Sequence, residues 1–202
     1  MSPNISYWVN SQDIICKVDE HWDSTLEDSK ARRVKSGVII GKSIFDFICD
    51  DVTRMYLRTM LQSVRLIPRV LQRPYRCDSP TEKRFMEMTL ELESNSWVRI
   101  SHKLLRTEPI ATPILFKSVT TANKIEQSSS YAAYHVRCSI CNRVRLTSGK
   151  DWRDVDKLPP EDITGIESLR VIYGVCSDCM DDLKIARKNR YGVKNDNFST
   201  RL

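Results

Sequence analysis

The chain has 202 residues, of which 41% are hydrophobic and 29% are charged, and its formal net charge is +6 with a pI near 9.0. This composition excludes a disordered chain, and no apolar run approaches the ~20 residues of a membrane-spanning helix. Because acidic residues are interleaved with the basic ones almost everywhere, the excess charge indicates a solvated surface rather than a clustered nucleic-acid footprint.

The first elements are predicted to be a strand followed by polar and short helical pieces. Residues 13–22 alternate in polarity, with Ile14, Cys16 and Val18 on one side and Ile15 and Lys17 on the other, which predicts a strand with one buried face. The polar segment that follows is helix-compatible, and residues 41–51 predict a short apolar turn with a brief helix.

The strongest helical signal lies in residues 52–69, where apolar residues repeat at three- and four-residue steps. The predicted apolar face consists of Val52, Tyr56, Leu57, Met60, Leu61 and Val64. Asp50 or Asp51 can cap the first turn, since a carboxylate there accepts the unpaired amides, and Pro68 ends the helix. Arginines line the opposite side, which we interpret as a solvated face rather than a phosphate-binding stripe.

Three consecutive strands are predicted next, in residues 70–77, 84–92 and 97–105. Pro74 indicates that the first of the three lies at a sheet edge or carries a bulge. Since a long helix precedes three neighbouring strands, the expected fold class is α+β, with an antiparallel sheet covered by helices. We assign this part of the chain to a first domain, residues 1–117.

The same part of the chain resembles a PAS domain, whose elements run β-β, short helices, a long helix and β-β-β. Over residues 7–109 it is similar in particular to a family of bacterial PAS-like proteins. The motifs that carry this similarity are Trp22 after the first strand, RCDSP at residues 76–80 and RFM at residues 84–86. The resemblance implies a sensor or interaction module that holds a ligand between sheet and helices, or pairs with another domain.

The resemblance also allows two photoreceptor cofactors to be tested. In flavin-binding PAS domains a reactive cysteine follows a glycine, and Ile44 occupies that place here, which argues against a flavin adduct. The lack of tyrosine in residues 20–40 argues against a thioester chromophore of the photoactive yellow protein type. His102, with Cys16 and Met88, is the remaining candidate for a cavity that binds haem or a small ligand. A core histidine bonded to a backbone carbonyl is the favoured alternative.

Residues 118–133 are polar and serine-rich, which predicts a linker between two independently folding parts, the second being residues 134–202. The second part contains two Cys-x-x-Cys pairs. The pairs are Cys138 with Cys141 and Cys176 with Cys179.

Two such pairs complete a tetrahedral four-thiolate site, so the spacing favours metal binding over the other chemistries of paired cysteines. Structural disulfides are disfavoured in a reducing compartment, and a thioredoxin-like centre needs a βαβ fold that the pattern lacks. Four thiolates favour one structural zinc per chain in a small zinc-ribbon-like module, with an iron–sulfur cluster as the minority alternative.

The segment CSICNRVRLTSGKDW…YGVCSDC is similar to a C-terminal segment found after PAS and other sensory domains in bacteria. Trp152 and Gly174 match that pattern together with the four cysteines, whereas Tyr173 and Ser177 replace its usual histidine and proline. We expect metal binding to supply folding free energy that so small a core lacks. The expected hydrophobic patch beside the metal consists of Trp152, Leu158, Ile163, Ile166 and Leu169.

We interpret the chain as a non-enzymatic, cytoplasmic bacterial signalling protein. The sequence shows no nucleophile–base arrangement, no secretory signal and no kinase-like output segment that can be recognised. Its output would be contact with another signalling protein or with a second copy, as in a PAS-type dimer, and no membrane partner is expected. Two alternatives stay open: a nucleic-acid-binding regulator, and a redox switch in which oxidation of the cysteines ejects the metal. The basic surface of the first alternative would contain Lys184, Arg187, Lys188 and Arg190.

Overall fold

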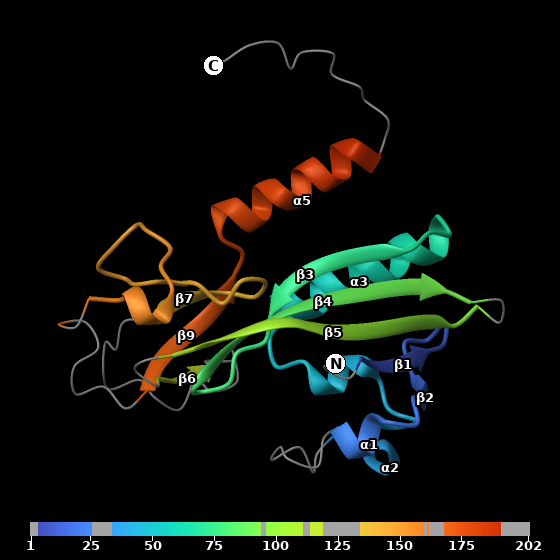
Figure 1. The fold of residues 1–202 in the computed structure, drawn as a ribbon. Helices are drawn as coiled ribbons and strands as arrows, with labels where there is room; N and C mark the ends of the chain where they lie inside the picture. The colour runs from blue at the N-terminus through green and yellow to red at the C-terminus, as the bar shows by residue number, and fades with distance from the viewer. Residues whose placement is uncertain are drawn as a thin grey trace, which may run out of the picture.

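A computed structural model describes most of the chain as two neighbouring sheets, each with its own buried core (Figure 1). The described residues are 4–25, 34–93, 96–110, 114–118, 134–159, 161 and 168–190, with side chains described only up to Lys184 in the last range. None of the helices in these ranges has both the length and the apolar character needed to span a bilayer.

The front sheet contains five antiparallel strands in the order β2-β1-β5-β4-β3. The strands are β1 (Ile5–Val9), β2 (Ile15–Val18), β3 (Leu71–Arg76), β4 (Glu82–Leu92) and β5 (Val98–Pro109). Pro74 lies in the edge strand β3, as its sequence predicts, because proline has no N–H to donate to a second neighbour.

Helices cover one face of the front sheet. They are α1 (Trp22–Thr25), α2 (Ser36–Ile39), the 3-10 helix η2 (Ile44–Phe47) and α3 (Asp51–Leu66). Asp50 caps α3, since its carboxylate accepts a hydrogen bond from the Thr53 amide at 2.7 Å. Leu61 and Val64 of α3 are fully buried in one core with strand residues such as Ile100. The element order in this part of the chain is the one that the PAS resemblance implies.

The beginning of the chain differs from the polarity pattern. That pattern predicts one strand, whereas the structure has two, and the fully buried residue of β2 is Ile15. A register shift in the β1–β2 ladder brings Ile15 opposite Val9. The strand therefore buries the side that contains Ile15, and the irregular ladder interrupts its regular pairing at this point.

The second sheet contains four strands in the order β6-β9-β7-β8. They are β6 (Leu115–Ser118), β7 (His135–Cys138), β8 (Val144–Arg145) and β9 (Ser168–Gly174), and the 3-10 helix η4 (Val155–Lys157) and α5 (Ser177–Arg190) accompany them. Strands β6 and β7 run parallel to β9, while β8 is antiparallel to β7. Since β6 belongs to this sheet, the predicted boundary at residue 117 does not follow the sheets.

The second sheet also differs from the predicted ribbon. In a ribbon of two knuckles each cysteine pair would sit in a strand–turn–strand hairpin. Here only the first pair lies between antiparallel strands, and the second pair leads from β9 directly into α5. The two strands that enter the cysteine pairs run side by side in the same direction.

Candidate metal centre

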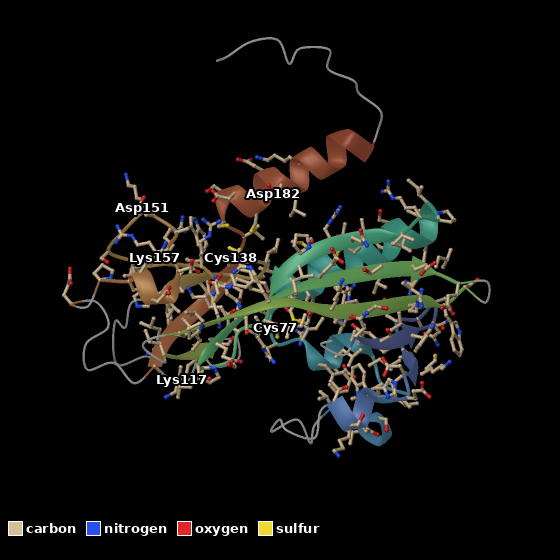
Figure 2. The ribbon with its side chains drawn as sticks, viewed as in Figure 1. Cys77, Lys117, Cys138, Asp151, Lys157 and Asp182 are labelled. Atoms are coloured by element: carbon tan, nitrogen blue, oxygen red, sulfur yellow. The ribbon has the colours of Figure 1, made fainter. Side chains whose placement is uncertain are left out.

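Four cysteine side chains converge at one end of the second sheet, and we call them the cysteine cluster. The cluster consists of Cys138, Cys141, Cys176 and Cys179. Their Sγ atoms all lie within 4.8 Å of one another, and Figure 2 shows sulfur atoms gathered near the label of Cys138. The sequence prediction that these four cysteines share one site agrees with this geometry.

The parallel pairing of β7 and β9 brings the two cysteine pairs together. Cys138 at the end of β7 lies directly opposite Gly174 at the end of β9, so both chains leave the sheet at the same edge. A Cβ atom at Gly174 would lie 3.1 Å from Cγ1 of Val136, so glycine permits the close approach. The first pair then closes in a tight turn. In this turn Asn142 adopts a φ of 60°, and its backbone N–H donates to the Cys138 carbonyl at 3.0 Å.

The donor set fits a soft, tetrahedrally coordinated metal. A tetrahedral zinc site with Zn–S bonds of about 2.3 Å places neighbouring sulfurs about 3.8 Å apart. The Sγ atoms of Cys141 and Cys176, one from each pair, are 3.6 Å apart. Zinc and iron–sulfur clusters favour thiolate sulfur as a ligand, whereas hard ions do not. The cluster is thus compatible with a metal ion that four cysteines would hold.

The cluster is shielded from water. Cys138 and Cys176 are fully buried and Cys179 nearly so. Tyr56 from α3 and Trp152 pack against the cluster, so the front sheet's long helix forms part of its wall. Such a dry surrounding strengthens the attraction between thiolates and a cation.

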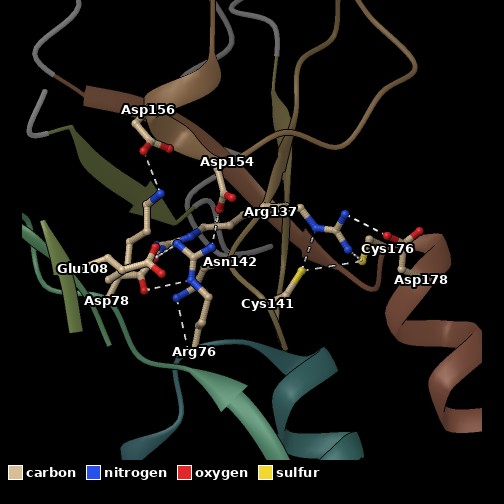
Figure 3. A network of polar contacts seen from close by, with 12 residues as sticks. Arg76, Asp78, Glu108, Arg137, Cys141, Asn142, Asp154, Asp156, Cys176 and Asp178 are labelled. Atoms are coloured by element: carbon tan, nitrogen blue, oxygen red, sulfur yellow. Dashed lines mark hydrogen bonds and ion pairs between the residues drawn. The ribbon is translucent and has the colours of Figure 1, made fainter. Parts of the chain in front are cut away.

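Arg143 supplies a cation beside the thiols, between Cys141, Cys176 and Asp178, which Figure 3 labels. Its Nε donates to Cys141 Sγ at 3.3 Å and its Nη2 to Cys176 Sγ at 3.4 Å, while Nη1 pairs with Asp178 at 2.8 Å. The backbone amide of Cys176 also donates to Cys138 Sγ at 3.4 Å. N–H donors of this kind orient ligand sulfurs and spread their negative charge. The sequence analysis missed Arg143, although it lies only two residues after a ligand.

The thiols of the cluster differ in how readily they ionise. Hydrogen bonds from Cys141 and Cys179 lower the pKa of the Cys138 thiol, whereas burial raises the pKa of the Cys176 thiol to about 11. Hydrogen bonding to the other thiols raises the pKa of Cys179 as well. Crowded sulfurs therefore share protons, and a divalent ion would displace those protons on binding.

An ion-pair network joins the front sheet to the second sheet beside the cluster (Figure 3). The buried guanidinium of Arg76, at the end of β3, is bonded to Asp78 at 2.6 Å and to Asp154, which precedes η4. The Arg76 amide donates to the Ile140 carbonyl at 2.8 Å, and Ile140 lies between the two cysteines of the first pair. Arg76 and Asp78 belong to the RCDSP motif, so that motif contacts the turn of the first cysteine pair.

Two further contacts extend this connection. Lys83 of β4 is buried, and its Nζ lies 2.7 Å from the carboxylate of Asp156 in η4. The hydroxyl of Ser139, in the first cysteine turn, donates to the carboxylate of Asp50 at 3.2 Å. Since Asp50 also caps α3, the cysteine turn is bonded to the start of the long helix of the front sheet.

The histidine expected to face a ligand cavity is enclosed by tyrosines. His102 is half-buried on β5 beside Met88 of β4, and its Nδ1 lies 2.8 Å from the Tyr75 hydroxyl. Its Nε2 lies 3.5 Å from the Tyr7 hydroxyl, and the Tyr7 ring stacks on it. Burial lowers the pKa of His102 to about 4, so the ring is neutral at pH 7. Cys16 lies on the edge strand β2, where its thiol donates to the Ile14 carbonyl at 3.4 Å, and it does not join this group.

Other predicted residues lie apart from the cluster or outside the described part of the chain. Leu158 and Leu169 belong to the core of the second sheet rather than to the patch beside the cysteines, which Trp152 does contact. Ile163 and Ile166 lie outside the described residues, as do the side chains of Arg187, Lys188 and Arg190. Lys184 is exposed and pairs with Asp181 at 2.8 Å.

Comparisons with known proteins give limited similarity. No family model matches the sequence, and no curated protein matches it. Among solved structures, a sensory box sensor histidine kinase from Vibrio cholerae is similar with a TM-score of 0.37 and 13% identity, over 51% of this chain and 82% of that chain. The function proposed below therefore depends on the residues of this chain.

Proposed function

We propose that this chain is a non-enzymatic signalling protein in which a PAS-like sensor or interaction domain is joined to a structural zinc module. The observation that carries the proposal is the closed set of four cysteine thiols within 4.8 Å of one another. Four protein ligands leave no open coordination position for water or substrate, which is typical of structural zinc and not of catalytic zinc.

Two features support the PAS-like part of the proposal. The element order of the first half is two strands, short helices, a long helix and three strands, with the helices on one face of an antiparallel sheet. The RCDSP turn, which contributes to the sequence resemblance, supplies the ion pairs that meet the metal module. A conformational change of the front sheet would therefore displace the residues that contact the turn of the first cysteine pair.

The proposal does not include haem at His102. Both ring nitrogens of His102 lie within 3.5 Å of tyrosine hydroxyls, so an axial bond to iron would require those contacts to break. We assign the Tyr7–His102–Tyr75 group a structural role as a satisfied polar group in the core.

Cobalt substitution tests the zinc module. Protein reconstituted with Co²⁺ should show the intense sulfur-to-cobalt charge-transfer and visible bands of a tetrahedral four-thiolate site. The Cys176→Ser variant should lose this spectrum, whereas the matched control Cys77→Ser, at an exposed cysteine outside the cluster, should keep it. A spectrum unchanged by Cys176→Ser would contradict the proposal.

A redox switch at the same cluster is the second candidate, because the Sγ atoms of Cys141 and Cys176 are only 3.6 Å apart. One equivalent of hydrogen peroxide would convert two thiols into a disulfide and two waters, removing two ligands and releasing the metal. Zinc release by peroxide that dithiothreitol reverses would support it. The nucleic-acid alternative gains no support from the described part of α5, where Lys184 is neutralised by Asp181.

A further inference from the structure

An apolar groove of about 570 Å³ lies between α3 and α5. Met55 and Leu66 on the α3 wall are 65% and 81% exposed, although both are large hydrophobic residues. Val175 and the α5 residues Met180 and Leu183 line the opposite wall. Figure 1 shows α5 extending over α3 from the second sheet. An open groove with exposed methionines is a surface built to receive another apolar face.

The α3 wall presents a mixed stripe beside the face that packs on the sheet. It runs from Val52 through Met55, Thr59 and Gln62 to Leu66, at helical spacing. At 1.5 Å per residue the stripe is about 21 Å long, which is the length of a helix of about 14 residues. The groove thus matches one partner helix lying along α3.

The charge of the groove indicates which kind of partner helix it can bind. The groove contains no aspartate or glutamate among its described lining residues, and its charged lining residue is Arg73 of β3. Arg73 has no acidic partner among the ion pairs of the part of the chain described. In a two-fold contact, the same groove of a second copy would offer Arg73 no carboxylate from its described lining residues, which disfavours a second copy as the occupant.

The cysteine cluster fixes one wall of the groove. Cys179 lies in the first turn of α5, next to Met180, and Leu183 one turn later packs against the cluster. Metal binding would therefore hold α5 at its distance from α3. Without metal, that wall loses its anchor.

We propose that the groove between α3 and α5 is a metal-dependent docking site for an amphipathic helix of a partner protein, with acidic residues flanking its apolar face. This inference rests on the proposed signalling role and names the partner class for it. The partner's leucine-type side chains would lie over Met55, Leu66 and Met180, and a carboxylate would face Arg73.

Fluorescence anisotropy with synthetic peptides tests the proposal on the full chain. The probe is a labelled 16-residue helix of leucine, alanine and glutamate with leucines at helical spacing. A second peptide replaces each glutamate by lysine, and a third scrambles the order. The glutamate peptide should bind saturably and at least about tenfold more tightly than the others. Equal binding of the lysine or scrambled peptide, or no saturation by the glutamate peptide, would overturn the proposal.

Variants locate the binding. Leu66→Asp should weaken binding of the glutamate peptide about tenfold, because it removes one apolar anchor. The matched control Leu105→Asp, at a leucine that is 50% exposed on β5, should leave binding unchanged. Arg73→Glu should invert the preference between the glutamate and lysine peptides. Equal losses in the two leucine variants, or a dimer that Leu66→Asp dissolves in sedimentation, would refute a partner helix in this groove.

Metal analysis of the same samples separates the two proposals. Full zinc content without peptide binding overturns the docking site and leaves the zinc module intact. Peptide binding by protein that never contains metal overturns the zinc module and the metal dependence. Loss of peptide binding after chelation, regained on adding zinc, is the expected result.

Discussion

Removing the carboxylate of Asp156 should destabilise the entire described fold, because it leaves the buried ammonium of Lys83 without its ion-pair partner. Lys83 is 5% exposed, and its Nζ lies 2.7 Å from Asp156. Breaking a buried ion pair from one side costs about 3–5 kcal/mol. Because 26% of the Asp156 side chain is exposed, water can partly replace the carboxylate, and we expect a loss of about 2–3 kcal/mol.

Thermal and urea unfolding followed by circular dichroism measure this loss. For a chain of this length, 2–3 kcal/mol corresponds to a decrease in Tm of about 4–12 °C. The double variant Lys83→Met, Asp156→Ala should recover most of the stability, since an apolar pair often replaces a buried ion pair without cost. The control Asp151→Ala, in the same segment but with a side chain that is 78% exposed, should change little.

Two results would refute this reasoning. One is a free energy of unfolding for Asp156→Ala that lies within about 0.5 kcal/mol of that of the natural chain. The other is a loss of stability in Asp151→Ala as large as that in Asp156→Ala. The shape of the transition is also informative, since Lys83 belongs to the front sheet and Asp156 to η4, which accompanies the second sheet. We expect one cooperative transition, whereas a shift of one transition out of two would show that the sheets unfold separately.

Three further predictions follow from the same contacts. The hydrogen bond from Lys83 lowers the pKa of Asp156, so the stability that this ion pair contributes should be full above the ordinary carboxyl pKa of about 3.9 and vanish as the pH falls further. Urea titrations should therefore give the natural chain and Asp156→Ala the same free energy of unfolding in acid. A difference that stays constant with pH would contradict this. Arg143→Ala should weaken zinc binding about 10–100-fold in competition with a chelator, whereas equal affinity to the control Arg145→Ala would count against the N–H···S contacts. Ser139→Ala should cost about 1 kcal/mol and speed hydrogen exchange in the first turn of α3, and unchanged exchange would exclude the link to Asp50.

Local patterns predicted the elements whose causes are local. The helix α3 follows from apolar spacing, and its start follows from Asp50, whose carboxylate accepts from Thr53 in the structure. The cysteine cluster follows from two ligand pairs at the spacing that one tetrahedral ion requires, and the four Sγ atoms do converge. In both cases the determining residues lie within a few positions of each other or share an unusual chemistry.

The features that the sequence did not reveal depend on distant pairing. Strand β6 has four residues and pairs with β9, which follows it by some fifty positions, so no local pattern assigns it to the second sheet. The bonds of Arg76 to Asp154 and of Lys83 to Asp156 likewise join residues more than seventy positions apart. Charged residues of this kind read as surface in a sequence, and only the fold shows that Arg76 and Lys83 are buried.

Elemental analysis of the intact protein, purified without added metal, tests the central claim most directly. We predict one zinc per chain bound by Cys138, Cys141, Cys176 and Cys179, in a protein without a visible absorption band. The Cys176→Ser, Cys179→Ser double variant should lose that zinc, while Cys77→Ser should retain it. Purified protein without metal, iron with a visible band in place of zinc, or full zinc in the double variant would contradict the account.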